Sequence, residues 1–463
     1  MKLVKSLLLG SAAGLVAVAG AQAADLPTKK SAPVEYVRVC DAYGAGFFYI
    51  PGTQTCLRVS GRIRAEYTWL NTRTSGAWNG TALAGITSAR AKDQTGLRAR
   101  GRLNIDARTQ TSWGTLRTYI RYEITRNSGV YLGGNTGPGG VGSSSHLSYG
   151  FIQFAGITAG RAQSFFDFYA DSWNYETLRD SDAAVNMLAY TATFGGGFSA
   201  TLSLEDKNER LGALASVPAG NLAVPAFLPG GTVGYSGYRS PDLVAALRVD
   251  QGWGSAQLSG MIGRRNTMAS NAVGAASRSY TAWALQAGVQ IKLPMLAAGD
   301  ELWIQGAYAN GSLDYIGVGP NNGTMSGGFL GRFQGGLLHN DFDAIAVGLP
   351  LGGYSLERTK GWTVMAALQH YWAPSFRQVV MLNYTKVNYG AAANTLLGDA
   401  SEWRAGTQLI WSPVSGFDIG LELMYAKLKQ DLPTGLTPAA LAAAGLKKNP
   451  SAYEARIRLQ RDF

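Results

Sequence analysis

Arginine recurs at every second position in several stretches of this sequence. The arginines of interest as a possible functional face are Arg62, Arg64, Arg98, Arg100, Arg102, Arg117, Arg121 and Arg161. Residues two apart share one face of a β-strand, and a guanidinium stays charged and binds oxyanions through its planar fork. The pattern therefore indicates a basic face that either steers anions or pairs with acidic residues on the same face, namely Glu66, Asp106 and Glu123.

Catalytic or metal-binding sets are not evident in the sequence. The three histidines, His146, His339 and His370, lie far in sequence from the two cysteines, Cys40 and Cys56. That spacing does not match the usual ligand sets of structural metal sites, and no oriented Ser-His-Asp set stands out around His146. The sequence predicts no catalytic, cofactor or metal site, although a membrane hydrolase that uses His146 stays open as a minor alternative.

The arginines belong to stretches in which polar and apolar residues alternate strictly. From Leu57 to Trp69, every odd-numbered residue is apolar or glycine and every even-numbered one is polar. A helix would scatter these charges around its whole surface, so each stretch is predicted to be a strand. Sixteen strands are expected, at about 57–69, 97–107, 116–125, 147–155, 157–163, 187–194, 198–206, 242–250, 254–264, 279–292, 301–310, 359–371, 376–388, 402–411, 417–428 and 452–463. Before the last strand, 438–446 is predicted to form a short helix.

The apolar faces of these strands are predicted to contact lipid. The strands exceed the five or six residues usual in globular sheets. Trp69, Trp411 and Tyr425 stand at the ends of apolar faces, where membrane barrels carry aromatic girdles. Short connections such as 195–197 alternate with long ones such as 207–241, as turns and external loops do in such barrels. The predicted fold is therefore all-β, a transmembrane antiparallel barrel of sixteen strands.

The first 23 residues are typical of an export signal. Lys2 and Lys5 precede an apolar run at 7–19, and Ala21-Gln22-Ala23 provides the small residues of a cleavage site. The mature chain is then expected to begin at Ala24, outside the cytoplasm.

Composition and charge limit the other functions. The chain has a formal net charge of +11 but only 15% charged residues, against about 25% in soluble domains. Because the basic residues are spread over alternating stretches, no nucleic-acid partner is expected. In an oxidising compartment Cys40 and Cys56 are expected to form a disulfide, the alternative being two free thiols. The predicted division is a signal peptide at 1–23, an N-terminal segment with the cysteine pair at 24–56, and the barrel at 57–463.

Two sequence motifs resemble those of the alphaproteobacterial trimeric porins, which are general outer-membrane diffusion porins. The first contains Gly44-Ala45-Gly46-Phe47-Phe48-Tyr49-Ile50-Pro51-Gly52 between the two cysteines. The second is Phe151-Ile152-Gln153-Phe154-Ala155-Gly156, followed by Gly160-Arg161-Ala162-Gln163-Ser164-Phe165-Phe166-Asp167. The likeness covers the whole mature chain up to Phe463, and a terminal aromatic residue is a usual assembly signal of outer-membrane barrels.

The resemblance implies a water-filled channel rather than an enzyme. It implies a homotrimer in outer-membrane lipid, with small hydrophilic solutes and ions diffusing through it, and a third external loop, here 164–186, that folds inward. The acidic residues of this loop are Asp167, Asp171, Glu176, Asp180 and Asp182. Facing the arginines, they would set up a transverse field across the narrowest part of the pore.

The arginine face leads to a hypothesis about ion selectivity. Neutral residues at Arg62, Arg98 and Arg100 are expected to shift the pore towards cations, and an unchanged reversal potential would exclude these residues as the selectivity wall. Three alternatives stay open at this point. The arginines could instead serve barrel stability as ion pairs, the channel could bind one substrate saturably, or the barrel could be an adhesive with a closed lumen.

Overall fold

The computed structural model describes most of the chain beyond its N-terminus. The described residues are 38–78, 81–132, 140–169, 173–217, 232–271, 274–321, 336–337, 342–348 and 354–463. The predicted signal peptide at 1–23 lies outside them. The chain divides into two compact units, residues 1–56 and 57–463.

The first unit, described from Arg38 onward, is held by a disulfide bond. Cys40 and Cys56 are joined, which confirms the predicted pairing. Both are buried in a small cluster with Phe47, and the backbone N–H of Cys40 donates to the carbonyl of Phe47 at 2.9 Å. The short strand β1 (Phe48–Tyr49) lies inside the loop that the bond closes.

Replacing both cysteines with serine is expected to loosen this first unit. The bond joins residues 16 positions apart, and a disulfide closing a loop of roughly 15 residues contributes about 3 kcal/mol. Chymotrypsin should therefore cleave the C40S/C56S variant faster than the parent protein at Tyr43 and Phe47. The heat-modifiable gel mobility of the barrel should stay the same. Equal cleavage rates in variant and parent would contradict a stabilising role of the disulfide in the first unit.

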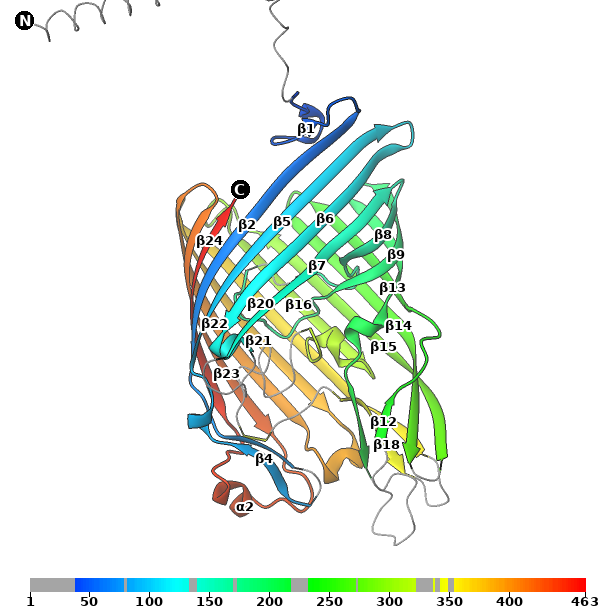
Figure 1. The fold of residues 1–463 in the computed structure, drawn as a ribbon, viewed down its shortest axis with the longest axis vertical. Helices are drawn as coiled ribbons and strands as arrows, with labels where there is room; N and C mark the ends of the chain where they lie inside the picture. The colour runs from blue at the N-terminus through cyan, green and yellow to red at the C-terminus, as the bar shows by residue number, and fades with distance from the viewer. Residues whose placement is uncertain are drawn as a thin grey trace, which may run out of the picture. The chain divides into compact units, whose positions relative to one another are not determined.

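Sixteen strands of the second unit, counted over its described residues, pair into a closed ring. Each strand pairs with the next along the ring, and β24 pairs with β2 to close it, with Tyr67 opposite Ile457. Figure 1 shows the strands tilted along the barrel wall. They are β2 (Thr55–Leu70), β5 (Thr95–Thr111), β6 (Gly114–Ser128), β7 (Val141–Phe154), β8 (Ile157–Gln163), β9 (Ala184–Gly195), β10 (Phe198–Glu205), β13 (Asp242–Gln251), β14 (Gly254–Asn271), β15 (Gly274–Lys292), β16 (Glu301–Asn310), β20 (Lys360–Ala373), β21 (Phe376–Asn388), β22 (Ala400–Val414), β23 (Phe417–Gln430) and β24 (Ser451–Asp462). The predicted sixteen-stranded barrel is confirmed.

Further short elements lie in the long connections, at one end of the barrel (Figure 1). They are β3 (Ser75–Trp78), β4 (Leu83–Thr87), β11 (Ala213–Val217), β12 (Thr232–Tyr235), β17 (Gly336–Leu337), β18 (Phe342–Gly348), β19 (Tyr354–Arg358) and helix α2 (Pro438–Ala443). The helix lies within the predicted 438–446. The short strands were not predicted, because they contain too few residues for an alternating pattern to stand out. Among the described residues, no helix is long and apolar enough to cross a membrane.

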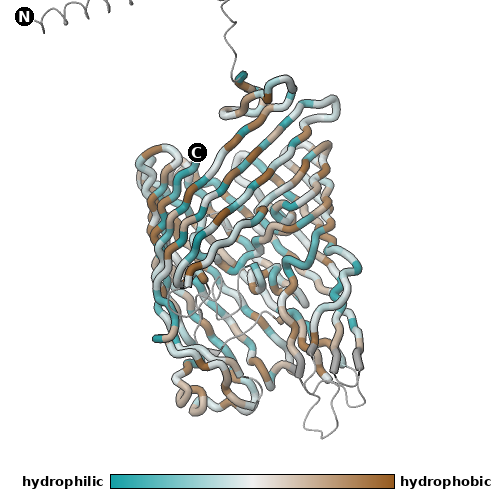
Figure 2. The backbone as a smooth tube through the Cα atoms, in the orientation of Figure 1, coloured by the Kyte–Doolittle hydropathy of each residue, from teal (hydrophilic) through white to brown (hydrophobic). Residues whose placement is uncertain are grey.

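The outward face of the barrel is apolar and bordered by aromatic rings. Teal and brown alternate along the strands in Figure 2, and outward residues such as Ile63 are about half exposed. Near the long connections, Trp403 packs on Tyr384 with ring centroids 4.6 Å apart. Trp411 lies opposite Phe376 near the short turns. Trp403 and Trp411 are about 26 Å apart along their strand, at roughly 3.3 Å per residue. At a strand tilt of about 40° this is a height of about 20 Å, close to an apolar band about 25 Å tall.

The barrel closes beside Phe463. The Gly61 N–H donates to the carbonyl of Phe463 at 2.8 Å, and the Phe463 N–H donates back to Gly61 at 3.0 Å. The Phe463 ring covers Gly61, where an added Cβ would collide with it. Glycine is therefore needed for this close approach, while the role of Phe463 as an assembly signal stays a prediction.

Candidate functional site

The predicted arginines lie together on the inner face of β2, β5, β6 and β8, because inner and outer residues alternate on each strand. Many of them bond to carboxylates of the same wall. Arg98 pairs with Glu66 at 2.7 Å and Arg102 with Glu123 at 2.5 Å. Both carboxylates are buried, so part of this cluster forms an ion-pair network. This agrees with the alternative that the arginines contribute to barrel stability.

Other arginines of the wall are open to solvent. The side chains of Arg62, Arg100 and Arg117 are 24–28% exposed, whereas Arg98 is only 8% exposed. Arg121 donates to Asn104 at 3.1 Å rather than to a carboxylate. The wall therefore presents several partly hydrated guanidinium groups inside the barrel.

The wall has more cations than anions among the residues that the structure describes. Its arginines are Arg62, Arg64, Arg98, Arg100, Arg102, Arg108, Arg117, Arg121, Arg161 and Arg458. Their carboxylate partners are Glu66, Asp106, Glu123, Glu209 and Asp462. Ten cations thus share five anions, so this face keeps a net positive charge.

The connection between β8 and β9 contacts inner-face side chains of distant strands. It spans 164–183, because β9 begins at Ala184, three residues earlier than the predicted limit of 186. The carbonyl of Phe166 accepts from Ser259 of β14 and Gln286 of β15, both at 2.7 Å. Farther along, the Tyr169 N–H donates to Gln305 of β16 at 3.0 Å.

Inner-face glycines make room for the aromatic residues of this connection. Tyr175 lies over Gly420 of β23, and Phe168 lies over Gly288 of β15, each so close that an added Cβ would collide with the ring or its hydroxyl. Arg458 stacks on the Tyr175 ring, with its Cζ 3.7 Å from the ring centroid. These aromatic side chains thus pack against the wall, and the close contacts contribute van der Waals attraction.

The acidic residues of the connection have different surroundings. Asp167 is buried and pairs with Arg210 at 2.8 Å, and the fully buried Glu176 pairs with Arg456 at 2.7 Å. Asp180 is also buried. The half-buried Asp182 accepts from Gln163 at 3.0 Å, and burial together with nearby Asp167 raises its pKa to about 6. Asp171 lies outside the described residues.

The arginines that hold the connection were not among those predicted. Arg210 follows β10, and Arg456 lies on β24, with their partners 43 and 280 positions away in sequence. Arg456 also pairs with Glu454 on its own strand. The alternating Glu454, Arg456 and Arg458 gave the same signal on β24 as on the early strands, but sequence alone does not reveal that they meet residues near 175.

A buried carboxyl ties two of the long connections together. Asp343 of β18 accepts from the N–H of Leu313 at 2.7 Å, from the N–H of Gly212 at 2.9 Å and from the Tyr235 hydroxyl at 2.7 Å. Burial is the main cause that raises the pKa of Asp343 to about 7. Between about pH 4 and pH 7 the folded protein therefore holds a proton here that the unfolded chain does not.

The stability of this loop assembly is expected to fall as pH rises through that window. The slope for one such proton is roughly 1.4 kcal/mol per pH unit. Limited proteolysis of the loops should therefore be slower at about pH 5 than at about pH 8. Asp343→Asn removes the titrating group and should flatten the profile, whereas an identical pH profile in parent and variant would show that another group governs it.

Each of the two described histidines lies near one carboxylate. His146 Nε2 lies 3.7 Å from Glu123 within the arginine wall, and His370 Nδ1 lies 2.6 Å from Asp300. His339 lies outside the described residues. No group of three or more potential metal ligands occurs among those that are described.

Comparison with known proteins agrees with this architecture. A family model described as the porin subfamily matches residues 25–454. Porin Omp2b of Brucella suis biovar 1 is 30% identical over 410 residues, covering 86% of this chain and 96% of that protein. Porin Omp2b of Brucella abortus (strain 2308) is 31% identical over 408 residues, with the same coverage.

A solved structure supports the fold independently. The outer membrane channel DcaP of Acinetobacter baumannii has a TM-score of 0.59 at 14% sequence identity, covering 90% of this chain and 99% of that one. At this identity the likeness concerns the fold alone. The family match spans nearly the whole chain, and the chain therefore belongs to the porin subfamily.

Proposed function

We propose that this porin is a water-filled passive diffusion channel for small hydrophilic solutes and ions in the bacterial outer membrane. The observation that carries the proposal is the closed barrel, with an apolar outward face and an inner face lined by partly hydrated arginines. In a barrel of this size the outward face meets lipid and the polar interior holds water. Family membership favours a channel over an enzyme.

Segment 164–183 is proposed to narrow the channel. Its support is the series of contacts that this segment makes with inner-face residues of β14–β16, β23 and β24. The contacts come from Phe166, Tyr169, Tyr175 and Glu176. Two of its buried acids, Asp167 and Glu176, pair with Arg210 and Arg456. Fewer loop acids than expected would then contribute to the predicted field across the pore. Among the described acids of the segment, Asp182 is the most exposed to solvent.

The excess of arginine on the wall supports a preference for anions. Charged side chains that line a pore set its ion selectivity, and here ten arginines share five carboxylates. Each partly exposed guanidinium is screened over about 10 Å at 0.1 M salt. The preference should therefore be moderate and should weaken as salt increases.

Self-association as a homotrimer after removal of residues 1–23 completes the proposal. Its support is the resemblance of the motifs at 39–59 and 151–167 to those of trimeric porins. Cross-linking of the native protein in outer-membrane extracts, together with sequencing of its N-terminus, would test the oligomer and the cleavage site. A monomer, or a chain that still begins at Met1, would contradict the corresponding part.

Liposome swelling tests the diffusion function. Vesicles containing the refolded protein should swell in isotonic glucose faster than in a trisaccharide, with initial rates that rise linearly with solute concentration. Empty vesicles and vesicles with heat-denatured protein are the controls. Rates equal to those of empty vesicles, measured with a protein that shows the gel mobility of a folded barrel, would contradict an open channel.

A further inference from the structure

Two lysines face outward from neighbouring parts of the barrel wall, near the long connections. Lys386 of β21 and Lys429 of β23 both lie opposite Ser401, which stands between them on β22. We call these three residues the lysine row. Thr385 and Leu428, which precede the two lysines, are buried on the inner face, so the lysines point away from the lumen. Neighbouring strands are about 4.8 Å apart, so the two lysine backbones are roughly 10 Å apart, and their long, flexible side chains can reach one group held between them.

A cavity of about 320 Å³ is lined by the lysine row. Lys448, from the connection before β24, adds a third ammonium group to its lining, and Asp399 and Asp431 are its acidic residues. The Asp399 carboxylate already accepts from the Asn388 amide at 2.6 Å and from the Tyr389 N–H at 3.0 Å. Three lysines against two carboxylates leave the lining with a net charge of +1. The cavity therefore favours an anion, and its volume is in the range of roughly 300–1,000 Å³ that holds small-molecule groups.

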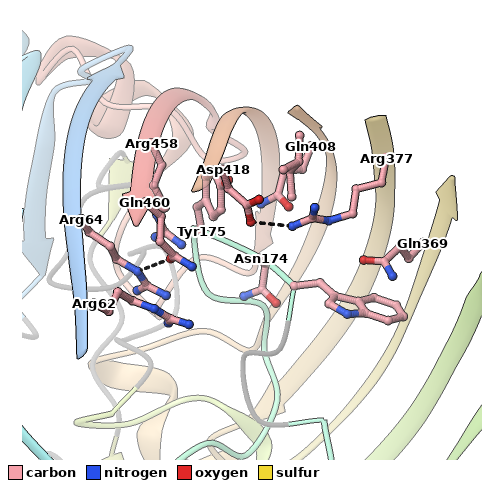
Figure 3. A pocket seen from close by; sticks show the side chains of 12 residues that line it. Arg62, Arg64, Asn174, Tyr175, Gln369, Arg377, Gln408, Asp418, Arg458 and Gln460 are labelled. Atoms are coloured by element: carbon pink, nitrogen blue, oxygen red, sulfur yellow. Dashed lines mark hydrogen bonds and ion pairs between the residues drawn. The ribbon is translucent and has the colours of Figure 1, made fainter. Parts of the chain in front are cut away.

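The lysines of this cavity differ from the arginines of the barrel interior in their partners. Inside the barrel, Arg377 pairs with Asp418 at 2.8 Å (Figure 3). Within the described part of the chain, Lys386, Lys429 and Lys448 form no ion pair and donate no side-chain hydrogen bond. Each ammonium group has three N–H donors. An anion can therefore bind here without displacing a protein carboxylate.

Aromatic rings place this cavity at the level of lipid headgroups. Tyr384 and Trp403 lie two residues from the lysine row on β21 and β22, with ring centroids 4.6 Å apart. The Trp403 side chain faces outward and is 49% exposed. Belts of tyrosine and tryptophan lie at the membrane–water interface. The lysine row is just beyond this belt, where ammonium groups on apolar stems meet lipid phosphates.

An apolar groove lies on the same three strands, on the membrane side of the aromatic belt. Its volume is about 620 Å³, and its lining includes Leu382, Ala405 and Tyr425. Ala405 is paired with Leu382 on one side and with Tyr425 on the other, so a small side chain between two larger ones forms the floor. Each of the three is four positions from the lysine row on its own strand, which is about 13 Å at roughly 3.3 Å per residue. A charged headgroup site and an apolar groove thus follow one another along the barrel wall; Figure 1 shows β21, β22 and β23 side by side.

We infer that the cavity and the groove together bind one anionic lipid from the leaflet that surrounds this end of the barrel. The lipid phosphate binds between Lys386, Lys429 and Lys448, and an acyl chain lies in the groove over Ala405. The net positive charge favours an anionic lipid over a zwitterionic one, and the groove favours a lipid over a free anion. The inference rests on the proposed membrane location but does not require conduction. It gives the outer surface of the barrel a site that retains one class of lipid.

Native mass spectrometry of the folded protein in detergent tests the site. Phosphatidic acid is compared with phosphatidylcholine that carries the same acyl chains, and inorganic phosphate is added as a competitor. The parent protein should retain phosphatidic acid in preference, and an equal concentration of phosphate should not displace it. Lys386→Gln/Lys429→Gln should weaken retention roughly ten-fold or more, because two charges at the headgroup level are removed. Lys292→Gln/Arg239→Gln removes the same charge at exposed positions near β15 and β13 and should match the parent.

A change in the groove separates the acyl chain from the headgroup. Ala405→Trp fills the groove and should weaken retention of long-chain phosphatidic acid more than that of a short-chain form, in a protein with the gel mobility of a folded barrel. Equal retention of the two lipids, displacement by phosphate, or parental retention in Lys386→Gln/Lys429→Gln would overturn the site. A smaller oligomer in Ala405→Trp with unchanged lipid retention would overturn it too and would assign the groove to a second copy of the chain. A conducting channel that fails these tests would keep the proposed diffusion function, whereas a folded barrel that retains the lipid without conducting would lose it.

Discussion

Arg456→Met is expected to release segment 164–183 from the wall and to give channels with larger and noisier currents. Arg456 is 1% exposed and bonds to Glu176 at 2.7 Å, to Glu454 and to the carbonyl of Tyr175. Removing one partner of a buried ion pair costs about 3 kcal/mol or more. Glu176 and Glu454 would then both lose the guanidinium that lies between them, so the attachment at 175–176 should fail before the barrel does.

Matched variants keep this prediction specific. Arg461→Met removes an exposed arginine from the same strand and should leave the currents unchanged. Adding Glu176→Gln to Arg456→Met removes one of the two carboxylates that lost Arg456 and should restore part of the parent behaviour. The gel mobility of each variant confirms that it is folded. Parental conductance and noise in a folded Arg456→Met channel would show that this contact does not hold the segment.

Replacing Arg62 and Arg100 together with glutamine is expected to shift the reversal potential towards cations. Both side chains are about one-quarter exposed inside the barrel. A unit charge acts on an ion about 4 Å away with about 1 kcal/mol in water, a factor of roughly five, so removing both should change the permeability ratio by at least about five-fold at low salt. At about 1 M salt the Debye length is near 3 Å, and the shift should shrink.

Arg98→Gln is the matched comparison for this pair. Arg98 is 8% exposed, pairs with Glu66 and stacks on the Tyr131 ring at 4.0 Å. Its charge is therefore largely compensated, and its removal should shift selectivity less than the double change. An unchanged reversal potential in Arg62→Gln/Arg100→Gln would exclude these residues as the selectivity wall, and an equal shift in Arg98→Gln would show that exposure does not decide the effect.

The sixteen strands could be predicted because lipid on one side and water on the other make apolar and polar residues alternate with a period of two. In β2, for example, Ile63 and Tyr67 face outward while Arg62, Arg64 and Glu66 face inward. That constraint acts residue by residue and is visible in the sequence. The short strands β11 and β18 lack it, because their faces pack against other loop residues such as Tyr315 and Leu397.

The contacts of the interior could be predicted only in part. The arginines of β2, β5 and β6 were placed on one wall because strands that follow one another in sequence pair side by side. Arg179 and Glu402, by contrast, are 223 positions apart and meet at 2.9 Å. No local pattern encodes such a pair, since it depends on the path of a connection across strands that are distant in sequence.

Single-channel conductance of the refolded protein in a planar bilayer tests the central claim most directly. A trimer of open, arginine-lined barrels should give ohmic current steps in groups of three, with a moderate preference for anions. Neutral sugars should not block this current saturably. A folded barrel that inserts into the bilayer without conducting ions would contradict the account.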